Sequence, residues 1–77
     1  MSQAEFLLLI DELLERDPGT FKGPEELAAN GWDSLGVVGF IALAEENFGI
    51  AIPPQKFLDV KIVSDLVGLV EERLAGH

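Results

Sequence analysis

The sequence predicts an all-α fold, a small four-helix bundle with three main helices and one short helix. Apolar residues recur at helical spacing in three segments, and glycines and prolines separate these segments. The alternation typical of a strand is confined to one short run, residues 49–52, which has no evident pairing partner. No sheet is therefore expected.

The first helix is expected at about residues 3–16. Ser2 and Glu5 have the spacing of a capping box, in which each side chain bonds the other residue's backbone. The residues expected to face the core are Phe6, Leu9, Ile10 and Leu13. Asp17-Pro18-Gly19 should end the helix, because proline disfavours helical backbone in the residue before it.

Residues 17–32 contain three glycines and two prolines without a sustained period. This composition predicts a long surface connection with at most a turn around residues 25–27. Two explanations of its length stay open: a functional role, or the need to cross from the end of one helix to the start of the next.

A second helix should begin after Asp33, a good N-cap residue, and end at Gly49. Pro53-Pro54 keeps it from resuming before a short helical segment near residues 55–58, and a last helix ends near Gly76. The expected core positions of the second helix are Val37, Phe40, Ile41, Ala44 and Phe48, and those of the last helix are Val63, Leu66, Val67, Val70 and Leu74.

Composition excludes several kinds of function. The chain has 77 residues, 48% of them apolar, which suits one core but leaves little room for a catalytic cleft. Fourteen acidic and five basic residues give a formal charge of −9, so neither nucleic acid nor a membrane is expected as a partner. Basic proteins are the expected partners, although acidity also serves solubility alone, the commoner explanation.

Metal binding through nitrogen or sulfur is not expected, because cysteine is absent and the one histidine is His77. The apolar stretch 6–10 is too short to span a bilayer, so the default location is cytoplasmic.

Ser34 is the strongest candidate for a residue with a chemical role. It lies between the long connection and the second helix, in the segment Gly31-Trp32-Asp33-Ser34-Leu35. A phosphate ester is electrostatically favoured at a helix N-terminus, where amide groups lack intrahelical partners. The alternative is that Ser34 is only the N-cap.

The whole pattern resembles the acyl and peptidyl carrier protein family. The resemblance rests on Asp33-Ser34-Leu35 after a glycine, the preceding loop, the helix end Glu45-Glu46-Asn47-Phe48-Gly49 and the following Ile52-Pro53, and it covers nearly the whole chain. It implies a single carrier domain over residues 1–77. Val63-Ser64-Asp65-Leu66 is similar to the start of the family's last helix, with Ile62 where threonine is frequent, so a weaker cap is expected there.

The resemblance implies that Ser34 receives 4'-phosphopantetheine from coenzyme A through a separate transferase. Asp33 would cap the helix and take part in recognition by the transferase and its magnesium. The protein would then be no enzyme. It would carry acyl groups as thioesters to partner enzymes of fatty-acid, polyketide or related biosynthesis, and it lacks a cysteine thiol that could compete with the arm.

Three alternatives remain beside this function. The first is an aminoacyl or peptidyl carrier in a nonribosomal-peptide-like pathway, and the second is a helical adaptor without an arm. The third takes Ser34 as the nucleophile of an esterase, since Asp-Ser-Leu also occurs in such enzymes. Trp32 in place of their glycine and a terminal His77 as general base argue against the third.

The implied partners are a phosphopantetheinyl transferase, an acyl-loading ligase or transferase, and synthases or other acyl-processing enzymes with basic docking surfaces. The protein itself is expected to be a monomer. The expected docking residues are Leu35, Val38, Gly39, Ala42, Glu45 and Glu46. Alternatively, the apolar members pack against the loop before Trp32. The negative end of the helix dipole disfavours Glu45 and Glu46, so local stability does not explain them.

Other residues have two explanations each. Gly36 and Gly39 make the second helix less acidic than in many fatty-acid carriers, which indicates either a specialised pathway or a close backbone approach. Trp32 either shields the phosphodiester or meets a partner, or else it belongs to the core, which we favour. By analogy with the family, Ala44, Ile52, Phe57, Ile62 and Leu66 line an acyl pocket; otherwise they are ordinary core residues.

Overall fold

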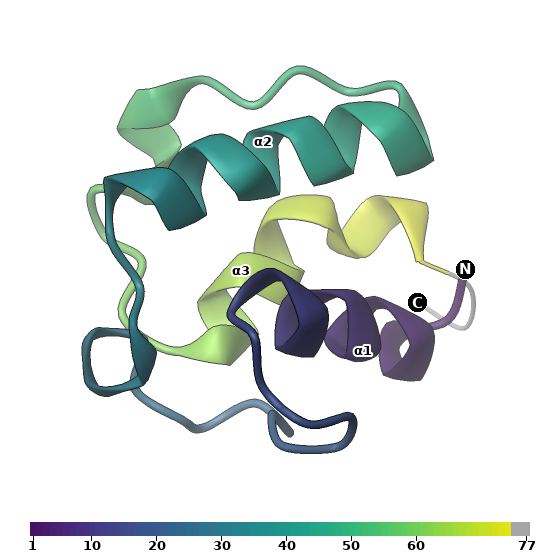
Figure 1. Cartoon of the computed structure of the whole chain (residues 1–77). Coiled ribbons are helices and arrows are strands. Elements are labelled where there is room, and N and C mark those ends of the chain that lie inside the picture. Colours follow the sequence, from purple (N-terminus) through teal and green to yellow (C-terminus); the bar gives the residue numbers. More distant parts are fainter. Residues whose placement is uncertain (75–77) are drawn as a thin grey trace.

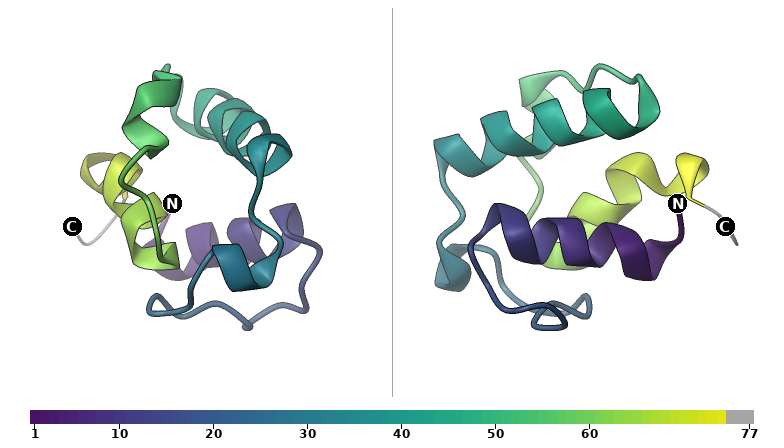
Figure 2. Two further views of the ribbon diagram at one scale, coloured as in Figure 1. Left: turned by 90° about the vertical axis from the view of Figure 1, so that its left-hand side faces the viewer. Right: turned by 45° about the vertical axis from the view of Figure 1, so that its right-hand side comes forward.

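The computed structural model describes residues 1–74 and confirms the all-α prediction. The helices are α1 (Gln3–Leu13), α2 (Ser34–Phe48) and α3 (Val63–Val70), with 3₁₀ turns at Ala28–Asn30, Pro54–Phe57 and Glu71–Arg73. α1 and α2 run in roughly opposite directions, so the end of α1 and the start of α2 lie at the same end of the molecule (Figures 1 and 2). None of the helices within residues 1–74 has the length and hydrophobicity that a membrane span needs.

The capping box at the start of α1 is present. The Ser2 hydroxyl accepts from the Glu5 N–H at 3.1 Å, and the Glu5 carboxylate accepts from the Ser2 N–H at 3.0 Å. This backbone hydrogen bond holds the pKa of the exposed Glu5 carboxyl below its ordinary value. Both partners thus stabilise the helix start.

α1 ends three residues earlier than the predicted residue 16. Glu15 adopts a left-handed conformation with φ 57°, and the N–H of Arg16 donates to the Asp11 carbonyl at 2.8 Å. The Glu15 N–H donates to the Glu12 carbonyl at 3.1 Å, which completes a Schellman motif. Glutamate rather than glycine occupies the left-handed position. The sequence therefore lacks the glycine that usually indicates such a helix end.

A buried carboxylate holds the start of the long connection against α1. Asp11 is 1% exposed and accepts from the N–H groups of Gly19 at 2.8 Å and Phe21 at 2.9 Å. Charge-assisted bonds of this kind contribute about 1.5–3 kcal/mol each. They keep Phe21, 2% exposed, in the core.

The connection 17–32 is therefore more than a surface loop. Its Phe21 and Leu27 side chains are core residues, and its helical turn lies at Ala28–Asn30 rather than at 25–27. Backbone bonds fasten it to the start of α3: the Leu27 N–H donates to the Lys61 carbonyl at 2.9 Å, and the Ser64 N–H donates to the Gly23 carbonyl at 2.8 Å. An isolated bridge between Glu26 and Ile62 lies among these bonds.

The remaining elements lie close to their predicted positions. α2 ends at Gly49, whose φ of 68° suits glycine, and the short helical segment is the 3₁₀ turn Pro54–Phe57. The predicted core residues of the last helix are all buried. However, α3 stops at Val70 and continues only as the turn Glu71–Arg73, before an extended Leu74. The predicted end at Gly76 lies outside the described residues.

The start of α3 has half of a capping box. The Asp65 carboxylate accepts from the N–H groups of Lys61 at 2.9 Å and Ile62 at 3.1 Å, and the Lys61 bond is the main cause that lowers the pKa of Asp65. Ile62 has no side-chain oxygen to return a bond, and none is made from that position. The weaker cap expected from isoleucine is confirmed.

Phe40 of α2 lies at the centre of an aromatic cluster. Its ring is edge-on to Phe6 of α1 at 5.6 Å and to Phe57 at 5.7 Å, and Trp32 lies 6.4 Å away. Phe40 and Phe6 are fully buried. Such edge-to-face pairs add about 0.5–1.5 kcal/mol each beyond the burial of their area. The cluster therefore fixes α2 against both α1 and the turn Pro54–Phe57.

Candidate functional site

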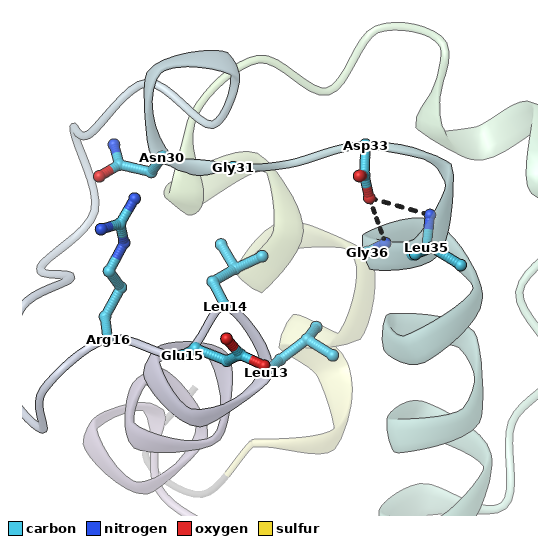
Figure 3. A pocket seen from close by; sticks show the side chains of 9 residues that line it. All are labelled: Leu13, Leu14, Glu15, Arg16, Asn30, Gly31, Asp33, Leu35 and Gly36. Carbon is cyan, nitrogen blue, oxygen red and sulfur yellow. Dashed lines mark hydrogen bonds between the residues drawn. The ribbon is translucent and has the colours of Figure 1, made fainter.

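The candidate site is built at the first turn of α2. Asp33 is the N-cap, with extended backbone, and its Oδ1 accepts from the N–H groups of Leu35 at 3.0 Å and Gly36 at 3.1 Å (Figure 3). Ser34 is the first helical residue. The alternative in which Ser34 is only the N-cap is therefore wrong, because Asp33 has that role.

Ser34 is exposed, and neither its hydroxyl nor its N–H has a hydrogen-bond partner among residues 1–74. The hydroxyl is thus accessible from solvent. One part of the electrostatic expectation needs correction: Asp33 already occupies two of the first-turn N–H groups. Of the N–H groups of Ser34, Leu35 and Gly36, only that of Ser34 remains available to a phosphate ester, beside the positive end of the helix dipole.

Trp32 anchors this turn to the core. It is half-buried, with ring centroids 6.4 Å from Phe40 and 6.2 Å from Phe57. A Cβ atom on Gly36 would lie 2.8 Å from Cε3 of the Trp32 ring. Trp32 thus has the core role favoured from the sequence, and glycine at 36 lets the ring lie against the helix backbone.

Gly39 likewise permits a close approach, here of α1. A Cβ atom at this position would lie 2.5 Å from Cδ1 of Leu13. Gly39 is half-buried, so it differs from the other predicted docking residues, which are exposed. Packing accounts for both glycines.

An apolar stripe with acidic neighbours is exposed along α2. Leu35 is 78% and Val38 64% exposed, and Ala42, Glu45 and Glu46 are exposed as well. The stripe therefore does not pack against the loop before Trp32. Leu58, 81% exposed after the turn Pro54–Phe57, is a further exposed apolar residue that no helical periodicity indicates.

The five candidate acyl-pocket residues do not all lie together. Ala44, Ile52, Phe57 and Leu66 are buried in the common core. Ile62 is half-buried and lines a hollow of about 510 Å³ with Glu26, Leu27, Ala28, Trp32, Val60 and Lys61.

A second hollow, of about 380 Å³, lies between the end of α1 and the start of α2 (Figure 3). We call it the α1–α2 hollow; its lining residues are Leu13, Leu14, Glu15, Arg16, Asn30, Gly31, Asp33, Leu35 and Gly36. The sequence analysis assigned no role to Arg16 or Asn30. The turn that brings Arg16 to the hollow has Glu15 at its left-handed position, so no glycine in the sequence indicates it.

Within residues 1–74, no three His, Cys, Asp or Glu side chains form a group that could hold a metal ion. His77, the one histidine, lies outside the described residues.

Comparison with known protein families identifies the class. Residues 5–70 match the family described as phosphopantetheine attachment site. The chain belongs to this family of carrier domains, which hold 4'-phosphopantetheine covalently. No solved structure matches the chain. An exposed serine hydroxyl at the start of α2, without a hydrogen-bond partner in the described part of the chain, fits such a covalent attachment.

Two of the helical glycines, Gly36 and Gly68, should respond oppositely to alanine. Gly68→Ala places a Cβ in open space and should raise the free energy of unfolding by about 0.5–1 kcal/mol. Gly36→Ala gains the same propensity but pushes the Trp32 ring, which costs about 1–3 kcal/mol, so we expect a net loss of up to about 2 kcal/mol. Urea denaturation followed by tryptophan fluorescence measures both. Equal stabilisation by the two substitutions would contradict the close packing of Trp32 on Gly36.

Proposed function

We propose that this chain is an acyl carrier protein in which Ser34 carries the 4'-phosphopantetheine arm. The observation that supports this most is that the Ser34 hydroxyl, inside the family's Asp-Ser-Leu sequence, is exposed and makes no hydrogen bond to residues 1–74. A separate transferase moves phosphopantetheine from coenzyme A to the Ser34 oxygen, which loses its proton as adenosine 3',5'-bisphosphate leaves. When attached, the arm supplies a thiol that holds an acyl group as a thioester.

The residues around Ser34 present its hydroxyl rather than activate it. Asp33 is engaged by the N–H groups of Leu35 and Gly36, and Trp32 fixes the turn to the core. No base is hydrogen-bonded to the Ser34 hydroxyl within residues 1–74. These observations support a carrier without catalytic duty. Asp33, exposed beside the hydroxyl, is proposed to contribute to recognition by the transferase.

The proposed cargo is an acyl group of fatty-acid, polyketide or related biosynthesis, on the strength of the sequence resemblance. An aminoacyl or peptidyl cargo is the alternative. Gly36 and Gly39 do not help to choose a pathway, because their contacts with Trp32 and Leu13 give them a packing reason. The acyl proposal thus rests on the sequence resemblance.

The exposed face of α2 is proposed as the docking surface for enzymes that act on the arm. Leu35, Val38 and Ala42 share one helix face, and Glu45 and Glu46 flank it at the C-terminal end. An apolar stripe beside carboxylates suits an enzyme surface with apolar anchors and basic residues. Gly39 lies at the edge of this surface, towards α1.

Attachment of the arm is tested by intact mass spectrometry. Incubation with coenzyme A, Mg²⁺ and a broad-specificity phosphopantetheinyl transferase should add the mass of one phosphopantetheine. Ser34→Ala should abolish the addition, whereas Ser64→Ala, at another exposed serine near the start of a helix, should leave it unchanged. An unmodified parent chain after treatment with several active transferases would instead support a helical adaptor.

Docking is tested by the rate of arm transfer. Val38→Asp puts a charge into the apolar stripe, so we expect the rate at limiting protein concentration to fall about tenfold. Leu8→Asp makes the same kind of change at a 46% exposed leucine of α1 and should have little effect. Added salt should slow transfer to the parent chain if the enzyme surface is basic. Equal losses in the two variants would contradict a specific docking face.

A further inference from the structure

We infer that the α1–α2 hollow is the resting place of the uncharged pantetheine part of the arm, with Arg16 and Asn30 as its polar contacts (Figure 3). This inference rests on the proposed attachment at Ser34. It adds a binding site on the protein's own surface, which holds the arm between visits to partner enzymes.

The hollow begins beside the attachment residue. Asp33, Leu35 and Gly36, which flank Ser34 in the first turn of α2, form one wall, and residues 13–16 at the end of α1 form the opposite wall (Figure 3). Its volume of about 380 Å³ is within the size range of small-molecule sites, roughly 300–1,000 Å³.

Several polar groups of the lining residues lack partners in the described chain. The Arg16 guanidinium makes no hydrogen bond or ion pair there, and in Figure 3 it extends towards the side of the hollow that Asn30 lines. The Asn30 side-chain nitrogen donates to the Glu26 carbonyl at 2.7 Å, so its oxygen remains an acceptor. The carbonyls of Leu13 and Leu14, at the end of α1, accept no bond. Donors and acceptors without partners therefore both occur on residues that line the hollow.

These groups match the chemistry of pantetheine, which has two amides, a hydroxyl and a gem-dimethyl group. The carbonyls of Leu13 and Leu14 and the Asn30 oxygen can accept from the amide N–H groups, and Arg16 can donate to the amide oxygens. The side chains of Leu13, Leu14 and Leu35 offer apolar surface to the gem-dimethyl group. Covering Leu35, which is 78% exposed, would remove apolar surface from water.

Charge decides which part of the arm enters. Glu15 and Asp33 also line the hollow, and their carboxylates disfavour an anionic phosphate inside it. The phosphodiester therefore stays at the rim next to Ser34, and the uncharged amide portion lies within. The hollow of about 510 Å³ that Trp32 and Ile62 line is more apolar and suits an aliphatic occupant better than two amides.

A spin label on the arm thiol tests this placement. The chain has no cysteine, so transfer from coenzyme A that carries a maleimide nitroxide gives a single label. With ascorbate-reduced protein as reference, amide NMR signals of Leu14, Arg16, Asn30 and Gly31 should broaden more than those of Lys61 and Ile62. Without the label, NOEs should connect the gem-dimethyl protons to the Leu13 and Leu14 methyl groups.

Two matched variants distinguish a specific contact between Arg16 and the arm from a general effect of losing one positive charge. Arg16→Gln should lower the occupancy of the hollow about threefold, and the preferential broadening with it, because it removes a charge-assisted donor. Lys61→Gln, which removes a cation from the other hollow, should leave the pattern unchanged.

Three results would overturn the inference. Broadening centred on Lys61 and Ile62 would place the arm in the other hollow, and weak, uniform broadening would place it in solvent. The third result is a pattern of signal broadening by the labelled arm that is the same in Arg16→Gln as in the parent chain. Failure of attachment is seen beforehand by mass and would contradict the proposed function itself, so the two failures are distinguishable.

Discussion

The position of Ser34 depends on the aromatic packing around Phe40. This ring contacts Phe6 of α1 and Phe57 of the short turn, and Trp32 lies against it from just before α2. Because Gly36 has no Cβ, Trp32 can also lie on the first turn of α2. The same core that stabilises the bundle therefore fixes the first turn of α2, in which Ser34 is exposed.

The cap of α2 divides two tasks between neighbouring residues. Asp33 satisfies the N–H groups of Leu35 and Gly36, so the helix start needs nothing from Ser34. The Ser34 hydroxyl consequently projects without a partner among the described residues. A serine cap would have tied the same oxygen to backbone amides and made it less available for a phosphodiester bond.

Local sequence patterns predicted most helices, but they did not predict the contacts between segments that are distant in the sequence. The Ser2–Glu5 box, the Asp33 cap and Gly49 mark helix ends with residues whose chemistry is local. The end of α1 was missed because Glu15 takes a conformation that glycine usually signals. The roles of Asp11 and Phe21 were missed because a buried carboxylate fixes the loop only after the chain folds back. The α1–α2 hollow likewise depends on that turn, so no motif indicates Arg16 or Asn30.

The central claim is that Ser34, and no other serine, carries the arm. Fragmentation mass spectrometry of the modified parent chain tests it directly, because Ser2, Ser34 and Ser64 are the serines available. The account predicts that every fragment containing Ser34 gains the mass of phosphopantetheine, and that fragments with only Ser2 or Ser64 remain unmodified. Attachment at Ser64 or Ser2, with Ser34 unmodified, would contradict it.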